Sequence, residues 1–263
     1  MKNSVIESIA IGSFDGMHTA HQRLAQEVDA LVIIERNSGY LTDGYRRSFF
    51  TKIFCCFYHF DTIKDLSPFE FIEKLQKDFP LLKKIVVGYD FHFGKEKSGD
   101  TNTLIKLFKG KVAVIKEISF EDIPIHSRVI KSYLNKGNIK KVTQLLGREY
   151  IISGEVIRGQ GLGKNALVPT LNMIPKGYQL PLHGVYATKT LIEDRWINSI
   201  TFLGHRITTD GNFAVETHII DKNLEMTPAY ISIKMIEFIR ENKKFETLAE
   251  LKAQIIKDIA KAN

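Results

Sequence analysis

The stretch SVIESIAIGSFDGMHTAHQRLAQEVDALV, residues 4–32, decides the fold of the N-terminal half of the chain. Its apolar run stops at Gly12, as a buried strand does when it enters a turn. Helical apolar spacing follows at Leu24, Ala25 and Val28. A strand, a glycine-containing turn and a helix in this order predict the first unit of an open α/β sheet.

Two histidines lie at the start of the predicted helix. His18 and His21 are three residues apart, so they share one face of the first helical turn. A helix N-terminus presents free backbone N–H groups and the positive end of the helix dipole, and it therefore attracts anions. Imidazoles at this place can donate hydrogen bonds to phosphate oxygens. The same spacing also fits surface or capping histidines, so it leaves both roles open.

The rest of the N-terminal half alternates between strand and helix patterns. Further short β-branched runs predict strands at residues 30–35, 83–91 and 110–118. Segments with helical spacing lie before and after the predicted strand at residues 83–91. They are residues 67–79 and 102–110, and we expect Ser67 and Asn102 to cap these helices. Strands that alternate with helices imply a parallel sheet.

The C-terminal half has a different pattern of predicted secondary structure. Residues 129–147 predict two helices that end at Gly147. Strand-like segments broken by Gly, Asp and Asn follow at residues 148–159, 184–204 and 212–220, which predict an antiparallel barrel or sandwich. The chain closes with an amphipathic helix whose apolar stripe is Leu248, Leu251, Ile255 and Ile259. We therefore expect two domains, residues 1–146 and 147–263.

Composition narrows the class of function. The chain has 263 residues, and 37 Lys and Arg against 30 Asp and Glu give a formal net charge of +7. This charge favours anionic ligands, which include nucleic acid, nucleotides and pyrophosphate alike. No apolar run reaches the roughly 18 residues that a spanning helix needs, and the polar N-terminus is unlike a signal peptide, so we expect a cytoplasmic protein without a membrane partner. Adjacent Cys55 and Cys56 fit neither a disulfide framework nor a metal half-site.

A second polar stretch follows the predicted strand at residues 83–91. It reads VGYDFHFGKEKSGD, residues 87–100, and it places Asp90 at the carboxyl end of the strand. Open α/β sheets bind their ligands at this end. Asp90 can therefore bind substrate hydroxyls or cap its own loop, and the sequence leaves both roles open.

Three motifs together resemble the bacterial bifunctional riboflavin kinase/FAD synthetase family over nearly the whole chain. They are GSFDGMHTAH at residues 12–21, VGYDFHFGKEKSGD at 87–100 and GQGLGKNALVPTLN at 159–172. The resemblance implies a Rossmann-like nucleotidyltransferase domain followed by a riboflavin kinase-like β-barrel with a terminal helix. It also implies that riboflavin is phosphorylated to FMN with ATP and Mg²⁺, and that FMN is adenylylated to FAD with a second ATP.

The resemblance gives roles to residues of the N-terminal half. His18 and His21 match the two histidines that contact the ATP phosphates during adenylyl transfer. The nucleotide-binding residues that it implies are Gly12, Phe14, Asp15, Gly16, Asp90, Ser127, Arg128 and Lys131.

This half also departs from the family pattern. Ala20 stands where the family has a glycine, and the phosphate motif at residues 125–131 keeps only its second serine and a basic end. Arg46 and Arg47 can supply replacement charge, or they can be a solvated pair.

In the C-terminal half the resemblance implies a kinase site. Thr170 and Asn172 of its PTxN motif would hold Mg²⁺, and Glu216 would act as the general base on the riboflavin hydroxyl. The phosphate-binding residues that it implies are Gly159, Gly161, Gly163 and Lys164, and Arg240 matches an arginine that closes near the flavin. Without the resemblance, Glu216 would be an outward polar position on an alternating strand.

Two alternatives stay open beside a bifunctional enzyme. The chain can have kept only one of the two activities, because departures from the family pattern occur in both halves. It can also be a flavin-responsive RNA-binding regulator with the same fold. Aromatic and basic residues do not interleave along one strand, as RNA readout requires, so we expect small-molecule substrates and no nucleic-acid partner.

Overall fold

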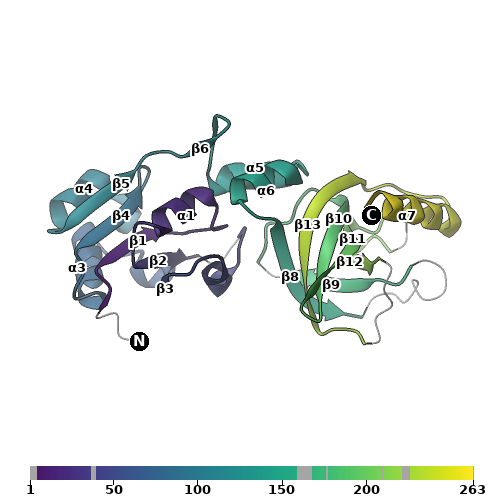
Figure 1. The fold of residues 1–263 in the computed structure, drawn as a ribbon, viewed down its shortest axis with the longest axis horizontal. Helices are drawn as coiled ribbons and strands as arrows, with labels where there is room; N and C mark the ends of the chain where they lie inside the picture. Colours follow the sequence, from purple (N-terminus) through teal and green to yellow (C-terminus); the bar gives the residue numbers. More distant parts are fainter. Residues whose placement is uncertain are drawn as a thin grey trace. The chain divides into compact units, whose positions relative to one another are not determined.

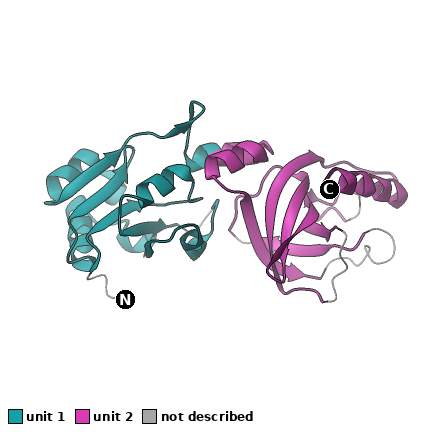
Figure 2. Ribbon diagram, in the orientation of Figure 1, with its two compact units in different colours: residues 1–129 teal, residues 130–263 magenta. Residues whose placement is uncertain are grey.

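A computed structural model describes residues 5–36, 40–158, 168–175, 177–208, 210–220 and 226–262. The chain forms two compact units, residues 1–129 and 130–263, coloured separately in Figure 2. The expected domain boundary between residues 146 and 147 falls inside the second unit, and as a boundary of function it stays a prediction. No helix in the described ranges is long and apolar enough to cross a membrane.

Unit 1 is built on a five-stranded parallel sheet of order β3-β2-β1-β4-β5 (Figure 1). Its strands are β1 Ser8–Gly12, β2 Ala30–Glu35, β3 Phe54–His59, β4 Lys84–Gly88 and β5 Lys111–Ile115. Ile9 of β1 lies opposite Ala30 on one side and Ile85 on the other. The strand order reverses between β1 and β4, and this switch point is where sheets of this type bind ligands. The prediction of a parallel α/β sheet is confirmed.

Both faces of this sheet are covered, which explains its continuous apolar runs. Ile9, Val32 and Ile85 belong to a core cluster that contains the helix residue Phe71. Ala10 and its neighbours on the opposite face form a second cluster with residues of the first helix.

Three helices of unit 1 begin at a residue whose side chain caps the helix. The helices of this unit are α1 Thr19–Ala25, α2 Phe60–Ile63, α3 Pro68–Asp78 and α4 Thr101–Leu107, with the 3₁₀ turns η2 Gly44–Phe50 and η3 Lys95–Lys97. Ser67 caps α3 in a capping box with Glu70, as the sequence predicts. The cap of α4 is Asp100, whose carboxylate accepts a hydrogen bond from the Thr103 amide, so the expectation of Asn102 was wrong by two residues.

The sequence pattern did not predict strand β3. Its FCCFYH sequence lacks β-branched residues, and most of its side chains are only partly buried because it forms an edge of the sheet. Cys55 and Cys56 are free thiols of this strand. Burial raises the pKa of Cys55 to about 11, which keeps it protonated and unreactive at neutral pH.

Two helices connect the sheet to the barrel. A small hairpin, β6 Ser119–Phe120 and β7 Ile123–Pro124, precedes α5 Ser127–Asn135, and α6 Ile139–Leu146 follows. Gly147 ends α6 in the left-handed conformation with φ of 72°, which confirms the predicted helix end.

Unit 2 is a closed six-stranded barrel of order β10-β11-β12-β9-β8-β13 (Figure 1). Its strands are β8 Tyr150–Ile157, β9 Leu171–Pro175, β10 Gly184–Ile192, β11 Arg195–His205, β12 Phe213–Ile219 and β13 Tyr230–Glu241, and the helix α7 Leu248–Ala262 follows. All of its strand pairs are antiparallel. The fold is therefore the barrel rather than the sandwich that the sequence left open.

A row of buried hydroxyl groups runs across β10, β11 and β12. Hydrogen bonds of 2.8 Å join Thr190 to Ser199, Ser199 to Thr188 and Thr188 to Thr201, and a bond of 2.9 Å joins Thr201 to Thr217. All five residues are buried, so the row satisfies polar groups that would otherwise destabilise the interior.

Candidate active sites

The first site lies in the turn between β1 and α1. His18 is buried and caps α1, because its Nδ1 accepts a hydrogen bond of 3.3 Å from the His21 amide. The two imidazole rings stack with centroids 3.5 Å apart. The edge of the Phe14 ring packs against His21 with centroids 5.1 Å apart. The capping role that the sequence left open is thus occupied by His18, while His21 Nδ1 is buried without a hydrogen bond to any described residue.

The turn that carries these histidines is strained. Phe14 and Met17 are fully buried, and both have positive φ, 49° and 41°, which side chains other than glycine rarely adopt. Gly16 between them has φ of 86°. Strain of this kind persists only where the surroundings enforce it, and it is concentrated at functional sites.

Asp15 fastens this turn to two other segments. Its Oδ1 accepts hydrogen bonds from the amides of Leu41, at 2.7 Å, and Thr42, at 3.2 Å. Its carbonyl oxygen accepts a bond of 2.7 Å from the Ser127 hydroxyl. Asp15 and Ser127 therefore hold the loop after β2 and the start of α5 against the β1–α1 turn.

Arg47 is fully buried, with no exposed side-chain surface, so the interpretation of this residue as half of a solvated pair was wrong. Its Nη1 forms an ion pair of 2.6 Å with Glu35, and its Nε donates to the Thr42 carbonyl at 3.1 Å. Its guanidinium lies 4.6 Å from the centre of the Tyr40 ring. Nη2 is buried without a hydrogen bond to a described residue.

Burial lowers the pKa of His21 well below its ordinary value, and the nearby charges of His18, Arg47 and His126 lower it further. His21 is therefore neutral at neutral pH and presents one N–H donor and one lone pair.

Three more polar side chains meet at the carboxyl ends of β4 and β5. Glu117 Oε1 accepts hydrogen bonds from the Tyr89 hydroxyl, at 2.6 Å, and from His126 Nε2, at 3.0 Å. These bonds lower the pKa of Glu117, while the hydrogen bond to Glu117 raises the pKa of Tyr89. Arg128 is exposed and adds positive charge beside them. The sequence analysis singled out Arg128 but missed the other three.

The remaining N-terminal candidates have simpler surroundings. Gly12 ends β1, and Asp90 is exposed in the turn after β4, where its carbonyl oxygen is bonded to His92 Nδ1 at 3.0 Å. Lys131 lies on α5 in unit 2.

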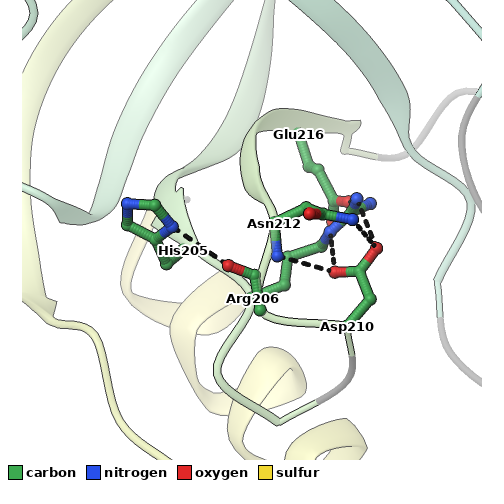
Figure 3. A network of polar contacts seen from close by, with 6 residues as sticks. His205, Arg206, Asp210, Asn212 and Glu216 are labelled. Atoms are coloured by element: carbon green, nitrogen blue, oxygen red, sulfur yellow. Dashed lines mark hydrogen bonds and ion pairs between the residues drawn. The ribbon is translucent and has the colours of Figure 1, made fainter.

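The second site lies on the barrel wall around Glu216, shown in Figure 3. Glu216 lies opposite Asn172 in the β9–β12 pair, so the two side chains share one face of the sheet. Its neighbours Val215 and Thr217 are buried, and Glu216 alternates with them toward the outer face. Thr170 is exposed just before β9.

Arg206 holds the carboxylate of Glu216. Its Nη1 lies 3.0 Å from Glu216 Oε1, and its Nε and Nη2 bond the two oxygens of Asp210 at 3.0 and 2.9 Å (Figure 3). Asn212 donates to the same carboxylate of Asp210 from its amide, at 3.1 Å, and from its side chain, at 2.9 Å. This loop between β11 and β12 thus fixes the guanidinium in place. Sequence reasoning missed Arg206 and Asp210, and their only signal was a polar turn between two strands.

A cavity of about 410 Å³ adjoins this network. Apolar side chains of β8, β9 and β12 form most of its lining, and the polar groups of Arg158, Asn172 and Arg206 complete it. His218 Nδ1 is bonded to the Pro169 carbonyl at 2.8 Å, which ties the segment of Thr170 to β12.

The other C-terminal candidates are Arg240 and four residues of the glycine-rich segment. Gly159, Gly161, Gly163 and Lys164 lie outside the described residues. Arg240 forms a two-pronged ion pair with the buried Asp258 of α7, at 2.8 and 2.7 Å, which ties β13 to that helix.

Two family models match the chain. The model described as Riboflavin kinase matches residues 146–263, and the model described as FAD synthetase matches residues 51–129.

Similar proteins cover almost the whole chain. A bifunctional riboflavin kinase/FMN adenylyltransferase from Pseudomonas fluorescens is 25% identical over 96% of this chain and 90% of its own length. The crystal structure of a macrolide-efflux protein from Streptococcus pneumoniae is 23% identical, covers 96% of this chain and 92% of its own, and has a TM-score of 0.82, which shows a shared fold. A bifunctional riboflavin kinase/FMN adenylyltransferase from Buchnera aphidicola subsp. Acyrthosiphon pisum is 30% identical over 98% of this chain and 91% of its own length. With this identity over nearly both full lengths, the chain belongs to the bifunctional riboflavin kinase/FMN adenylyltransferase family.

Proposed function

We propose that the chain makes FMN from riboflavin at the barrel site and FAD from FMN at the site of the parallel sheet, using ATP in both reactions. The observation that supports the kinase half is the position of Glu216 beside Asn172 and Arg206, two residues that line a largely apolar cavity. Residues 147–263 would form the kinase domain and residues 1–146 the adenylyltransferase domain. We place both reactions in the cytoplasm. The net charge of +7 favours anionic substrates such as nucleotides.

In the kinase reaction Glu216 would accept the proton of the riboflavin 5′-hydroxyl. The hydroxyl oxygen then forms a bond to the γ-phosphorus of ATP, the bond from that phosphorus to the β-γ bridging oxygen breaks, and ADP leaves. The hydrogen bond from Arg206 to the Glu216 carboxylate uses Oε1. Among the described residues, none bonds Oε2, which is therefore the oxygen that would accept the proton.

The donor set at this site suits Mg²⁺. Thr170 and Asn172 offer a hydroxyl and an amide oxygen, and Mg²⁺ bound together with nucleotide phosphates takes few oxygen ligands from the protein. We propose that these two side chains hold the ion. When bound, Mg²⁺ would neutralise charge on the phosphates of ATP.

In the adenylyl reaction a phosphate oxygen of FMN would attack the α-phosphorus of ATP, and pyrophosphate would leave. His18 and His21 would contact the phosphates, since this chemistry depends mainly on positioning and charge stabilisation. The strained turn and the ties from Asp15 would keep the imidazoles in place.

One incubation tests both halves. The purified chain is supplied with riboflavin, ATP and Mg²⁺, and FMN and FAD are separated by chromatography. We expect both products. FMN alone would support the alternative of a single retained activity, and the absence of both products would overturn the proposal.

A further inference from the structure

Tyr89, Glu117 and His126 come from three separate segments. Tyr89 follows β4, Glu117 follows β5, and His126 precedes α5. Besides their bonds to Glu117, the Tyr89 hydroxyl and His126 Nε2 lie 3.2 Å apart, so each group of this polar trio contacts the other two.

Packing does not require the trio. Tyr89 is 42% exposed and the Glu117 side chain 44%, so water could satisfy the hydroxyl and the carboxylate, while the His126 side chain is 18% exposed. Exposed pairs of this kind contribute little to stability. Three side chains that gather without need of burial suggest a role in binding.

The trio lies at the place where a phosphate is expected. Ser127, the residue after His126, bonds the backbone of Asp15 in the β1–α1 turn at 2.7 Å. His126 acts electrostatically on His21, and so does the buried Arg47. Arg128 adds charge on the outer side. Three basic side chains therefore lie in this region, and two of them are paired: Arg47 with Glu35 and His126 with Glu117.

Glu117 leaves one nitrogen of His126 available. Its carboxylate faces Nε2, which keeps a proton on that nitrogen and fixes the direction of the ring. Among the described residues, none forms a hydrogen bond with Nδ1. We propose that His126, oriented by Glu117 and Tyr89, is a third phosphate-contacting histidine of the adenylyl site. In its doubly protonated form, the ring would donate from Nε2 to Glu117 and from Nδ1 to a phosphate oxygen of the reactants.

This inference rests on the proposed adenylyl reaction but can be tested apart from it. The phosphate oxygen can belong to the pyrophosphate portion of ATP or to FMN. In either case the imidazolium would stabilise negative charge while the bond from FMN to the α-phosphorus forms and the bond to pyrophosphate breaks. No proton needs to be transferred in the step.

The experiment compares His126→Asn, His126→Lys and Glu117→Gln with the wild-type chain. Calorimetry measures the binding of inorganic pyrophosphate and, separately, of FMN, while steady-state kinetics measure kcat and KM for FAD formation. His59→Ala is the matched control, because His59 is exposed at the end of β3. Far-UV circular dichroism of each variant, compared with the wild-type chain, reports whether unit 1 is folded.

We expect His126→Asn to weaken the binding of one phosphate ligand and to slow FAD formation by about tenfold or more, the scale of a lost charge-assisted hydrogen bond. Weaker pyrophosphate binding would assign His126 to ATP, and weaker FMN binding would assign it to FMN. His126→Lys should recover part of the loss because it restores the charge, and Glu117→Gln should give a smaller loss in kcat. If His126→Asn binds both ligands and makes FAD as His59→Ala does, the inference is overturned.

The two proposals fail in different ways. A wild-type chain that makes no FAD overturns the adenylyl reaction, but weaker pyrophosphate or FMN binding by His126→Asn would still support the phosphate contact. A wild-type chain that forms no FAD and binds neither ligand overturns both.

Discussion

Arg206 and Glu216 are joined by an ion pair of 3.0 Å through Nη1, and the other two nitrogens of the guanidinium, Nε and Nη2, bond Asp210. The proposed base of the kinase reaction is therefore fixed by a cation that cannot itself move freely. An anchored carboxylate keeps the geometry that proton transfer requires.

We expect Glu216→Gln to lower kcat for FMN formation by about 10²-fold or more, because the amide retains the shape but cannot accept the proton. The binding of riboflavin and ATP should change little. Rapid-quench measurement of FMN checks the rate, and Glu237→Gln, on an exposed position of β13, is the matched control. Turnover equal to that control would remove Glu216 from the mechanism.

Arg206→Ala should lower kcat for FMN formation while leaving FAD formation from supplied FMN unchanged, because it frees the Glu216 carboxylate. Arg206→Lys should recover part of the rate, since it restores the charge but not the two-pronged grip on Asp210. The comparison of kcat with KM for riboflavin distinguishes the roles. A rise in KM with unchanged kcat would mean that Arg206 binds substrate instead of positioning Glu216.

His21→Ala should slow FAD formation from FMN by about 10²-fold, the scale of one lost preorganised donor. Riboflavin phosphorylation at the barrel site should stay unchanged, and far-UV circular dichroism serves as the folding control for unit 1. Ala20→Gly tests the methyl group that stands between the two histidines. Tighter ATP binding in that variant would show that the methyl group obstructs the nucleotide, and unchanged binding would show that the site tolerates it.

Acid should loosen the start of β1 through Asp29. Its Oδ2 accepts hydrogen bonds from the Ser8 hydroxyl, at 2.8 Å, and from the Ser8 and Glu7 amides, at 2.9 and 3.1 Å. The bond from the Ser8 hydroxyl makes the largest contribution to lowering the pKa of Asp29 in the folded chain. Its stabilisation is therefore fully present above the unfolded pKa of about 4 and is lost as the pH falls through the lower folded value.

Hydrogen exchange of the Ser8 amide from pH 6 to pH 3 checks this expectation, after correction for the intrinsic exchange rate. Protection should fall with acid in the wild-type chain and should be low and flat in Asp29→Ala. Asp65→Ala, on an exposed position, is the control. Equal pH dependence in Asp29→Ala and wild type would contradict the assignment.

Thr201→Val should destabilise the barrel by about 1–3 kcal/mol, because it leaves the hydroxyls of Thr188 and Thr217 without their shared partner. The single tryptophan, Trp196 on β11, reports unfolding of this unit by fluorescence in urea. Thr227→Val removes an exposed hydroxyl and should have little effect. A midpoint equal to that of the control would mean that the hydroxyl row adds nothing to stability.

Local patterns predicted much of the fold. The motif turn after β1, the capping box at Ser67 and the helix end at Gly147 depend on neighbouring residues, so they can be read directly. The edge strand β3 could not be predicted from its local pattern, because its burial depends on neighbours distant in sequence. Closure of the barrel likewise depends on the pairing of β10 with β13.

The residues of the candidate sites also fall into two groups, those that a local motif predicts and those that only the fold brings together. His18, His21, Asn172 and Glu216 lie in recognisable motifs. Within unit 1 the fold stacks His18 on His21, and within unit 2 it places Asn172 opposite Glu216. Arg47 looked like a surface residue because nothing nearby in sequence announces Glu35 as its partner. Tyr89, Glu117 and His126 are individually ordinary, and only the ends of β4 and β5 bring them together.

The hydroxyl row in the barrel has a direction. Each of its hydroxyls carries one proton, and the four bonds between the five residues use four of those protons. One proton must therefore be donated outside the row. If it belongs to Thr190, every other hydroxyl donates toward Thr190, and if it belongs to Thr217, the whole sequence of donors reverses. Whichever end offers an acceptor to this last proton thus orients all five dipoles, and a change at Thr190 on β10 would be felt at Thr217 on β12, two strands away.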